Sequence, residues 1–120
     1  MSHSVLVPAA ACLLAAATAC GGPGRSTYEW GGYQNSVREF AAQPGGVDVG
    51  AHVARLTASE EKSLLGGRPL PPGFQAHLGY LLLLQGDIDR ALVAFESEMQ
   101  SYPESRAFVA GLLDRLEGAQ

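Results

Sequence analysis

Residues 72–105 read PGFQAHLGYLLLLQGDIDRALVAFESEMQSYPES, and this stretch decides the fold. Apolar residues recur every three or four positions on both sides of Gly86, which is the spacing of two amphipathic helices. We expect one helix over about 73–85 and a second over about 88–102, with Asp87 as the N-cap of the second. Two helices joined by so short a turn lie antiparallel, so the sequence predicts a helix hairpin.

The rest of the chain after Ser26 also reads as helical, because no segment alternates apolar and polar residues as a strand does. We expect further helices over about 28–41, over about 48–66 and over about 104–116, which makes the domain all-α, a short helical array. The apolar residues expected to face its core are Trp30, Tyr33, Val37, Phe40, Ala41, Val49, Val53, Leu56, Leu64, Ile88, Ala91, Leu92, Phe95, Met99, Phe108, Leu112, Leu113 and Leu116.

The spacing within residues 72–105 resembles the tetratricopeptide repeat, a pair of antiparallel helices. Gly79 and Ala91 are small where the repeat brings its helices together, and Phe95 is large where it fills the space between them. An ordinary helix hairpin is the alternative, since packing alone demands similar spacing. One repeat cannot bury its faces alone, so we expect the last helix to cap one side and the helices before Gly66 to cover the other.

The N-terminal residues 5–19, VLVPAAACLLAAATA, form an uncharged apolar run that is too short for a transmembrane helix and typical of a signal peptide. The run ends in Ala17-Thr18-Ala19-Cys20, which resembles the bacterial lipobox. The resemblance implies cleavage before Cys20 and lipid attachment to its thiol. Ala17 stands where leucine is usual, and His3 replaces the expected lysine or arginine, so ordinary signal-peptidase cleavage is the alternative.

These features divide the chain into a signal peptide (1–19), a lipidated cysteine with a flexible tether (20–27) and a helical tetratricopeptide-like domain (28–120). The glycines and proline after Cys20 suit a tether. We expect the lipid on Cys20 to hold the protein to a membrane of the cell envelope. Gly21 is not the aspartate associated with inner-membrane retention, so we expect the outer membrane, with the domain facing the periplasm.

The order of motifs resembles an uncharacterised family of short bacterial lipoproteins, labelled only as a domain of unknown function and often encoded beside CsgG-like lipoproteins. The similar stretches follow the cysteine and are YEWGGY (28–33), LPPGFQAHLG (70–79), FESE (95–98), YPES (102–105) and Phe108. The resemblance implies a part in an envelope secretion or assembly complex, with another envelope protein, such as a CsgG-like lipoprotein, as partner. Regulation of a peptidoglycan enzyme is the alternative function.

Motifs for chemistry are absent from the sequence. Eight Lys and Arg against twelve Asp and Glu give a net charge of −4, and the basic residues are scattered, which argues against nucleic-acid binding. His52 and His77 lie in separate predicted helices without zinc-protease spacing. We expect Glu98 to lie on a solvated helix face, and we expect the same of Glu60 and the adjacent Glu61. We therefore expect no metal, no cofactor, no small-molecule substrate and no catalysis.

Binding to a protein is the stronger prediction. In tetratricopeptide arrays the first helix of each unit lines the concave surface, which the resemblance assigns here to Ala76, Tyr80 and Leu83. The alternative is that the N-terminal helices pack on that surface and make it part of the core. Exposed aromatic residues often anchor interfaces, so the sequence offers a second set of candidates, for which core packing is again the alternative. That set is Tyr28, Trp30 and Tyr33.

Overall fold

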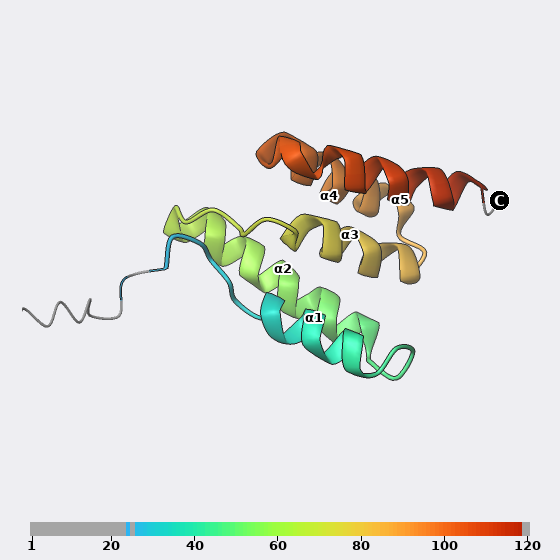
Figure 1. Cartoon of the computed structure of the whole chain (residues 1–120). Coiled ribbons are helices and arrows are strands. Elements are labelled where there is room, and N and C mark those ends of the chain that lie inside the picture. Colours follow the sequence, from blue (N-terminus) through green and yellow to red (C-terminus); the bar gives the residue numbers. More distant parts are fainter. Residues whose placement is uncertain (1–23, 25, 119–120) are drawn as a thin grey trace, which may run out of the picture.

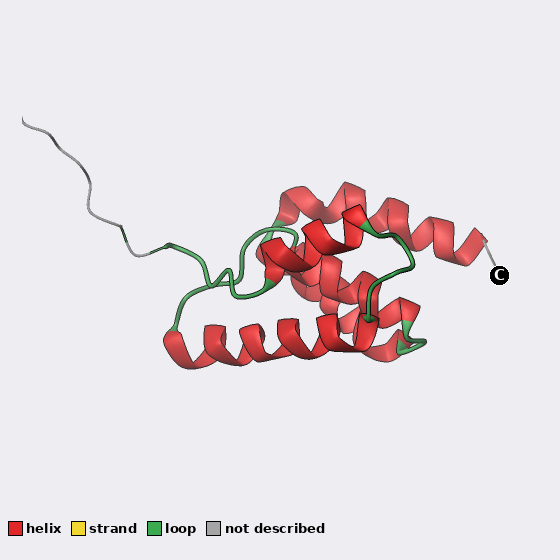
Figure 2. Ribbon diagram, turned by 90° about the horizontal axis from the view of Figure 1, so that it is seen from below, coloured by secondary structure: helices red, strands yellow, loops and turns green. Residues whose placement is uncertain are grey.

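The computed structural model of the chain describes Gly24 and residues 26–118, and every regular element in that part is a helix (Figure 1). Figure 2 shows how loops join these helices into two hairpins and a last helix. None of the helices in the described part combines the length and apolar character needed to cross a bilayer. The elements are α1 (Tyr33–Ala42), α2 (Val49–Gly66), α3 (Phe74–Leu84), α4 (Ile88–Ser101), a 3-10 turn (Pro103–Ser105) and α5 (Arg106–Gly118).

The ends of α2 and the start of α4 lie close to where the sequence predicts them, because local capping chemistry sets them. The Asp48 carboxylate accepts a hydrogen bond from the Ala51 amide at 3.1 Å, and Asp87 does the same for Arg90 at 3.3 Å. At the other end of α2, Gly67 takes the left-handed conformation (φ 66°) that closes many helices. These caps confirm the boundaries that follow from the sequence.

The α3–α4 hairpin is the densest packing in the domain. Gly79 on α3 lies against the ring of Phe95 on α4, so close that a Cβ atom at Gly79 would lie 2.8 Å from Phe95 Cε1. Phe95 and Ala91 are fully buried. The predicted antiparallel hairpin, with a small residue facing a large one, is therefore present. The core is formed by Val53, Leu56, Phe74, Ala76, Leu78, Leu81, Leu82, Ala91, Ala94, Phe95 and Val109.

The first helix begins five residues later than predicted. The segment before Tyr33 follows an irregular path, and the Glu29 amide donates to the Pro69 carbonyl at 2.9 Å. Gly31 has a φ of 45° and lies so close to α2 that a Cβ there would come within 2.0 Å of Ser59 Oγ. The glycine therefore breaks the expected helix and lets the chain cross α2 closely.

Several residues predicted to face the core are exposed instead. Ile88 and Leu92 are 50% and 47% exposed, because the buried stripe of α4 runs through Ala94 and Glu98. Leu64 is 84% exposed, since only the earlier turns of α2 are covered. In α1 and α5, residues other than the predicted ones occupy the fully buried positions. Val37, Ala41 and Phe108, which were predicted to face the core, are exposed.

Candidate partner-binding groove

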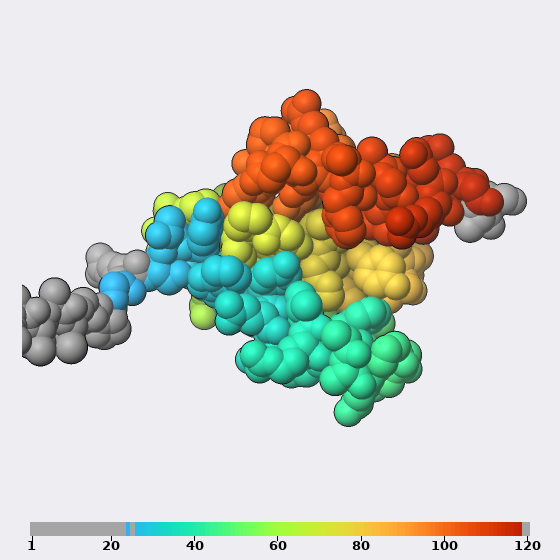
Figure 3. Space-filling view, in the orientation of Figure 1, coloured from blue at the N-terminus to red at the C-terminus, as the bar shows by residue number. Residues whose placement is uncertain are grey.

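A groove of about 420 Å³ lies between α1, α3 and α5. Its floor is formed by α3 through Ala76 and Tyr80, and Val37 of α1 and Phe108 and Leu112 of α5 contribute to its sides. Figure 3 shows α3 between α1 and α5 on this face of the molecule. Phe108 is 67% exposed, which is unusual for so large an apolar side chain. The groove is thus apolar and open to a ligand.

Three of the six residues predicted for binding line the groove, and the other three do not. Ala76, Tyr80 and Tyr33 line the groove. Leu83 is half-buried and packs against the core. Tyr28 and Trp30 lie outside the groove, in the segment before α1, and both are half-buried.

The aromatic residues before and in α1 form a continuous row that ends at the groove. Tyr28 meets Trp30 edge-on with ring centroids 6.0 Å apart, and Trp30 stacks on Tyr33 at 6.3 Å. Tyr33 in turn packs on the buried Phe74 of α3 at 5.5 Å. Burial raises the pKa of Tyr33, with a smaller contribution from the nearby Glu98 carboxylate. The row fixes the start of α1 on α3 and leaves the groove beside it.

Glu98 lies at the groove as a fully buried side chain, which corrects the prediction of a solvated position. Its carboxylate accepts hydrogen bonds from the amides of Gly73 at 2.7 Å, Gln75 at 3.1 Å and Ala76 at 3.3 Å. The Ser105 hydroxyl donates a fourth at 3.0 Å. A carboxylate suits the N-terminus of α3 because the free amides and the helix dipole both favour negative charge there. No sequence pattern signals this role.

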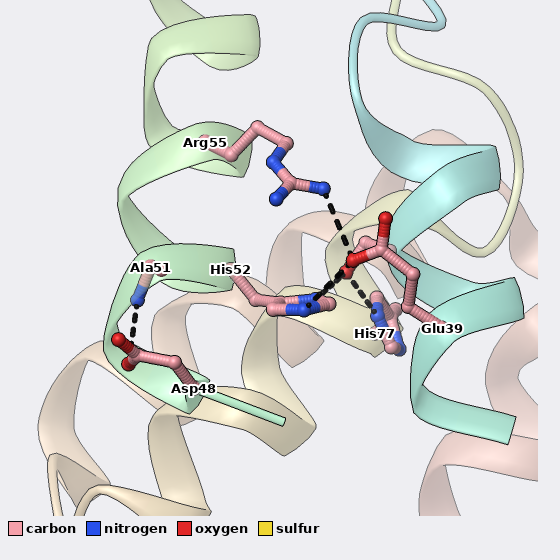
Figure 4. Close-up of polar contacts among 7 residues, drawn as sticks. Glu39, Asp48, Ala51, His52, Arg55 and His77 are labelled. Atoms are coloured by element: carbon pink, nitrogen blue, oxygen red, sulfur yellow. Dashed lines mark hydrogen bonds and ion pairs between the residues drawn. The ribbon is translucent and has the colours of Figure 1, made fainter. Parts of the chain in front are cut away.

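A polar cluster missed by the sequence prediction holds α1 against α2 and α3. Ser36 is fully buried, and its hydroxyl oxygen lies 2.7 Å from Nδ1 of His52 and 3.0 Å from Nε2 of His77. Nε2 of His52 lies 3.2 Å from the Glu39 carboxylate, which also meets Arg55 at 3.5 Å. Figure 4 shows Glu39, His52, Arg55 and His77 converging from α1, α2 and α3.

The donor and acceptor capacities of these side chains set the direction of each hydrogen bond in the cluster. Glu39 only accepts, so Nε2 of His52 donates to Glu39, and in that tautomer Nδ1 of His52 accepts the Ser36 hydroxyl proton. Ser36 then accepts from Nε2 of His77. Burial and the neighbouring His52 lower the pKa of His77 to about 4, so His77 is neutral near pH 7. In this arrangement each of these contacts pairs one donor with one acceptor.

The cluster has the residue types of a serine hydrolase but not their accessibility. The Ser36 side chain has no exposed surface, so a substrate cannot reach its hydroxyl in this structure. Among the residues that the structure describes, no group of three or more His, Cys, Asp and Glu side chains could hold a metal ion. His77 also lines the groove, so the cluster's evident effect is to fix a groove wall.

Comparison with models of known protein families identifies the family of this chain. Residues 27–112 match the model of the family described as Domain of unknown function (DUF4810). The chain belongs to this family. The matched residues include the aromatic row, the Ser36 cluster, α1–α4 and all of the groove lining except Arg115. No curated protein and no solved structure matches the chain.

Proposed function

We propose that this DUF4810 protein is a non-catalytic accessory lipoprotein that holds another envelope protein in the groove between α1, α3 and α5. The observation that carries the proposal is the open apolar groove at the position where tetratricopeptide arrays bind their ligands. Ligand sites in proteins are concave and mostly apolar, with a few polar groups that orient the ligand. Tyr80, His77 and Arg115 supply such groups here.

Buried hydrogen bonds hold the α1 and α3 sides of the groove in place, which favours a binding role. Glu98 fixes the first turn of α3, and the Ser36 cluster fixes α1 beside it. A site that is ordered before its ligand arrives loses less conformational entropy on binding. The exposed Phe108 and Val37 then offer apolar area that a partner can bury.

The anchor in this proposal is the lipid on Cys20, which lies outside the described residues. A lipid there confines the domain and its partner to one membrane face and raises their effective concentration. We propose the outer membrane, with the domain in the periplasm, and a CsgG-like lipoprotein as partner. Replacement Cys20→Ala, or inhibition of the lipoprotein signal peptidase, should move the protein from the membrane to the soluble fraction. Retention in the membrane fraction would refute the anchor.

Co-purification from detergent tests the binding proposal. We expect the tagged protein to bring down a specific envelope protein, and Phe108→Asp to reduce its recovery at least tenfold because it places a charge in the groove. Val93→Asp is the matched control, since Val93 is 64% exposed, close to the 67% of Phe108, but lies on α4 outside the groove. No specific partner, or equal loss in both variants, would refute the proposal. Recovery of a peptidoglycan enzyme would favour the regulatory function instead.

A further inference from the structure

Two adjacent leucines at the end of α2 have no packing role in the domain. Leu64 is 84% exposed and Leu65 is 91% exposed, the largest exposed fractions among the large apolar side chains that the structure describes. Gly66 and Gly67 follow at once and end the helix. Exposing two leucines together in water is unfavourable, so this tip, residues 62–68, is suited to an apolar partner.

The tip lies at the end of the domain where the chain arrives from its N-terminal side. Ser26 and Thr27 share a surface depression with Gly66 and Arg68. Figures 1 and 2 both show the segment before α1 running beside the end of α2. Arg68 also pairs with the Glu29 carboxylate across this contact. The beginning of the domain and the leucine tip are therefore neighbours.

Chain length brings Cys20 into range of this tip. Only residues 21–25 separate Cys20 from Ser26. A fully extended chain spans at most about 3.6 Å per residue, so the Cα atoms of these two residues lie within about 22 Å of each other. A lipid on Cys20 thus keeps this end of the domain close to the bilayer surface.

The charges around the leucines are of both signs. Lys62 and Arg68 flank the two leucines in sequence, and both are exposed. Of the two acidic residues that precede them, Glu60 accepts a hydrogen bond from Gln75 at 2.7 Å, whereas Glu61 is exposed. Arg68 pairs with Glu29 and Lys62 adjoins Glu61, so the tip has no excess of basic charge. The exposed leucines themselves suit the tip to the lipid headgroup region.

We propose that Leu64 and Leu65 insert into the interfacial region of the bilayer and fix which end of the domain faces the membrane. This inference rests on the proposed lipid on Cys20, which supplies the attachment, while the leucines supply the orientation. The groove residues lie on α1, α3 and α5 rather than at the tip. Insertion of the tip therefore leaves the groove open to a partner.

A fluorescent label on the lipidated mature protein tests this inference. The variant Leu65→Cys carries an environment-sensitive NBD label, and Val93→Cys with the same label is the control. Acylation blocks Cys20, so only the introduced thiol is labelled. On vesicles of phosphatidylethanolamine and phosphatidylglycerol, we expect blue-shifted emission at position 65 that lipids with a headgroup nitroxide quench, and unchanged aqueous emission at position 93. Adding Leu64→Asp should return the label at 65 toward aqueous emission.

The possible outcomes distinguish a failure of the leucine insertion from a failure of the lipid anchor. Aqueous emission at position 65 in protein that floats with the vesicles would overturn the insertion and leave the lipid anchor standing. Failure of the protein to float, with aqueous emission at both positions, would overturn the anchor and the insertion together. Equal blue shifts at 65 and 93 would also overturn it, because they would mean that the domain has no fixed orientation.

Discussion

At the scale of single residues, Glu98 connects α3, α4 and the 3-10 turn through one buried carboxylate. Its four hydrogen bonds join the first turn of α3 to Ser105. Hydrogen bonds to charged groups are about twice as strong as neutral ones. A buried group that loses its partner costs its full desolvation penalty. The start of the groove floor therefore depends on this one side chain.

Replacing Glu98 should destabilise the domain strongly. We expect Glu98→Ala to lower the free energy of unfolding by about 3 kcal/mol, because three amides and a hydroxyl lose their acceptor. Glu98→Gln should cost less, since it keeps one acceptor oxygen. Glu96→Ala is the control, as Glu96 is exposed two positions earlier on the same helix and should change stability by less than about 0.5 kcal/mol. Urea unfolding measures all three, and equal effects at 96 and 98 would contradict the assigned role.

His77 should make stability depend on pH in a defined window. Its pKa is about 4 in the folded domain against an ordinary 6.5, so below pH 6.5 the unfolded chain binds a proton that the folded chain does not. The free energy of unfolding should fall as pH decreases from 6.5 to 4, by about 1–2 kcal/mol once solvent screening of the half-buried ring is allowed for. Urea unfolding at several pH values measures this slope.

The variant His77→Gln isolates that contribution, because its amide can still donate to Ser36 but does not titrate. Carboxylates that titrate below pH 5 are common to both proteins and cancel in the comparison. We expect the variant to lose less stability than the wild type between pH 6.5 and 4. The same slope in both proteins would show that His77 is not the responsible group.

At the scale of elements, the α3–α4 hairpin depends on the contact between Gly79 and Phe95. Gly79→Ala should lower the free energy of unfolding by about 2 kcal/mol, because the new methyl group overlaps a fully buried ring. Gly111→Ala in α5 is the matched control, since nothing lies within 4 Å of a Cβ there, and it should stabilise by up to about 1 kcal/mol. Thermal unfolding that gives the two variants the same sign would contradict this packing.

The helices were predictable from sequence because caps and apolar spacing are local properties. Asp48, Gly67 and Asp87 act within one turn of where they stand, so their roles can be inferred without knowing the fold. The polar contacts of Ser36 and Glu98 depend on partners up to 41 residues away, which the sequence does not reveal. Ser36 and Glu98 therefore look like ordinary helix residues until the helices are assembled.

The site was predictable only in part for the same reason. Ala76 and Tyr80 follow from the repeat spacing of α3, and both line the groove. Phe108 was expected in the core, yet it contributes to the groove because Val109, one position later, is the fully buried residue of α5. A rotation of about 100° per residue separates the two. Which face of α5 turns inward depends on α4, and the spacing of α5 alone does not decide it.

At the scale of the whole molecule, we propose three parts with separate roles, which are a lipid anchor, an orienting tip and a binding groove. The tip lies beside the start of the domain, whereas the groove lies among α1, α3 and α5. We propose that the end with the tip contacts lipid and that the groove contacts a protein. Binding in the groove is the main proposal, because the proposed anchor would give the protein its location and only the groove would give it a partner.

Site-specific photocrosslinking in intact cells tests that claim most directly. A photoreactive amino acid at Phe108 lies in the groove, and the same residue at Val93 has nearly equal exposure outside it. We predict that irradiation produces one discrete crosslinked envelope protein from position 108 and none from position 93. Identical products from both positions, or no product from position 108 in cells that contain the full envelope, would contradict a partner-binding groove.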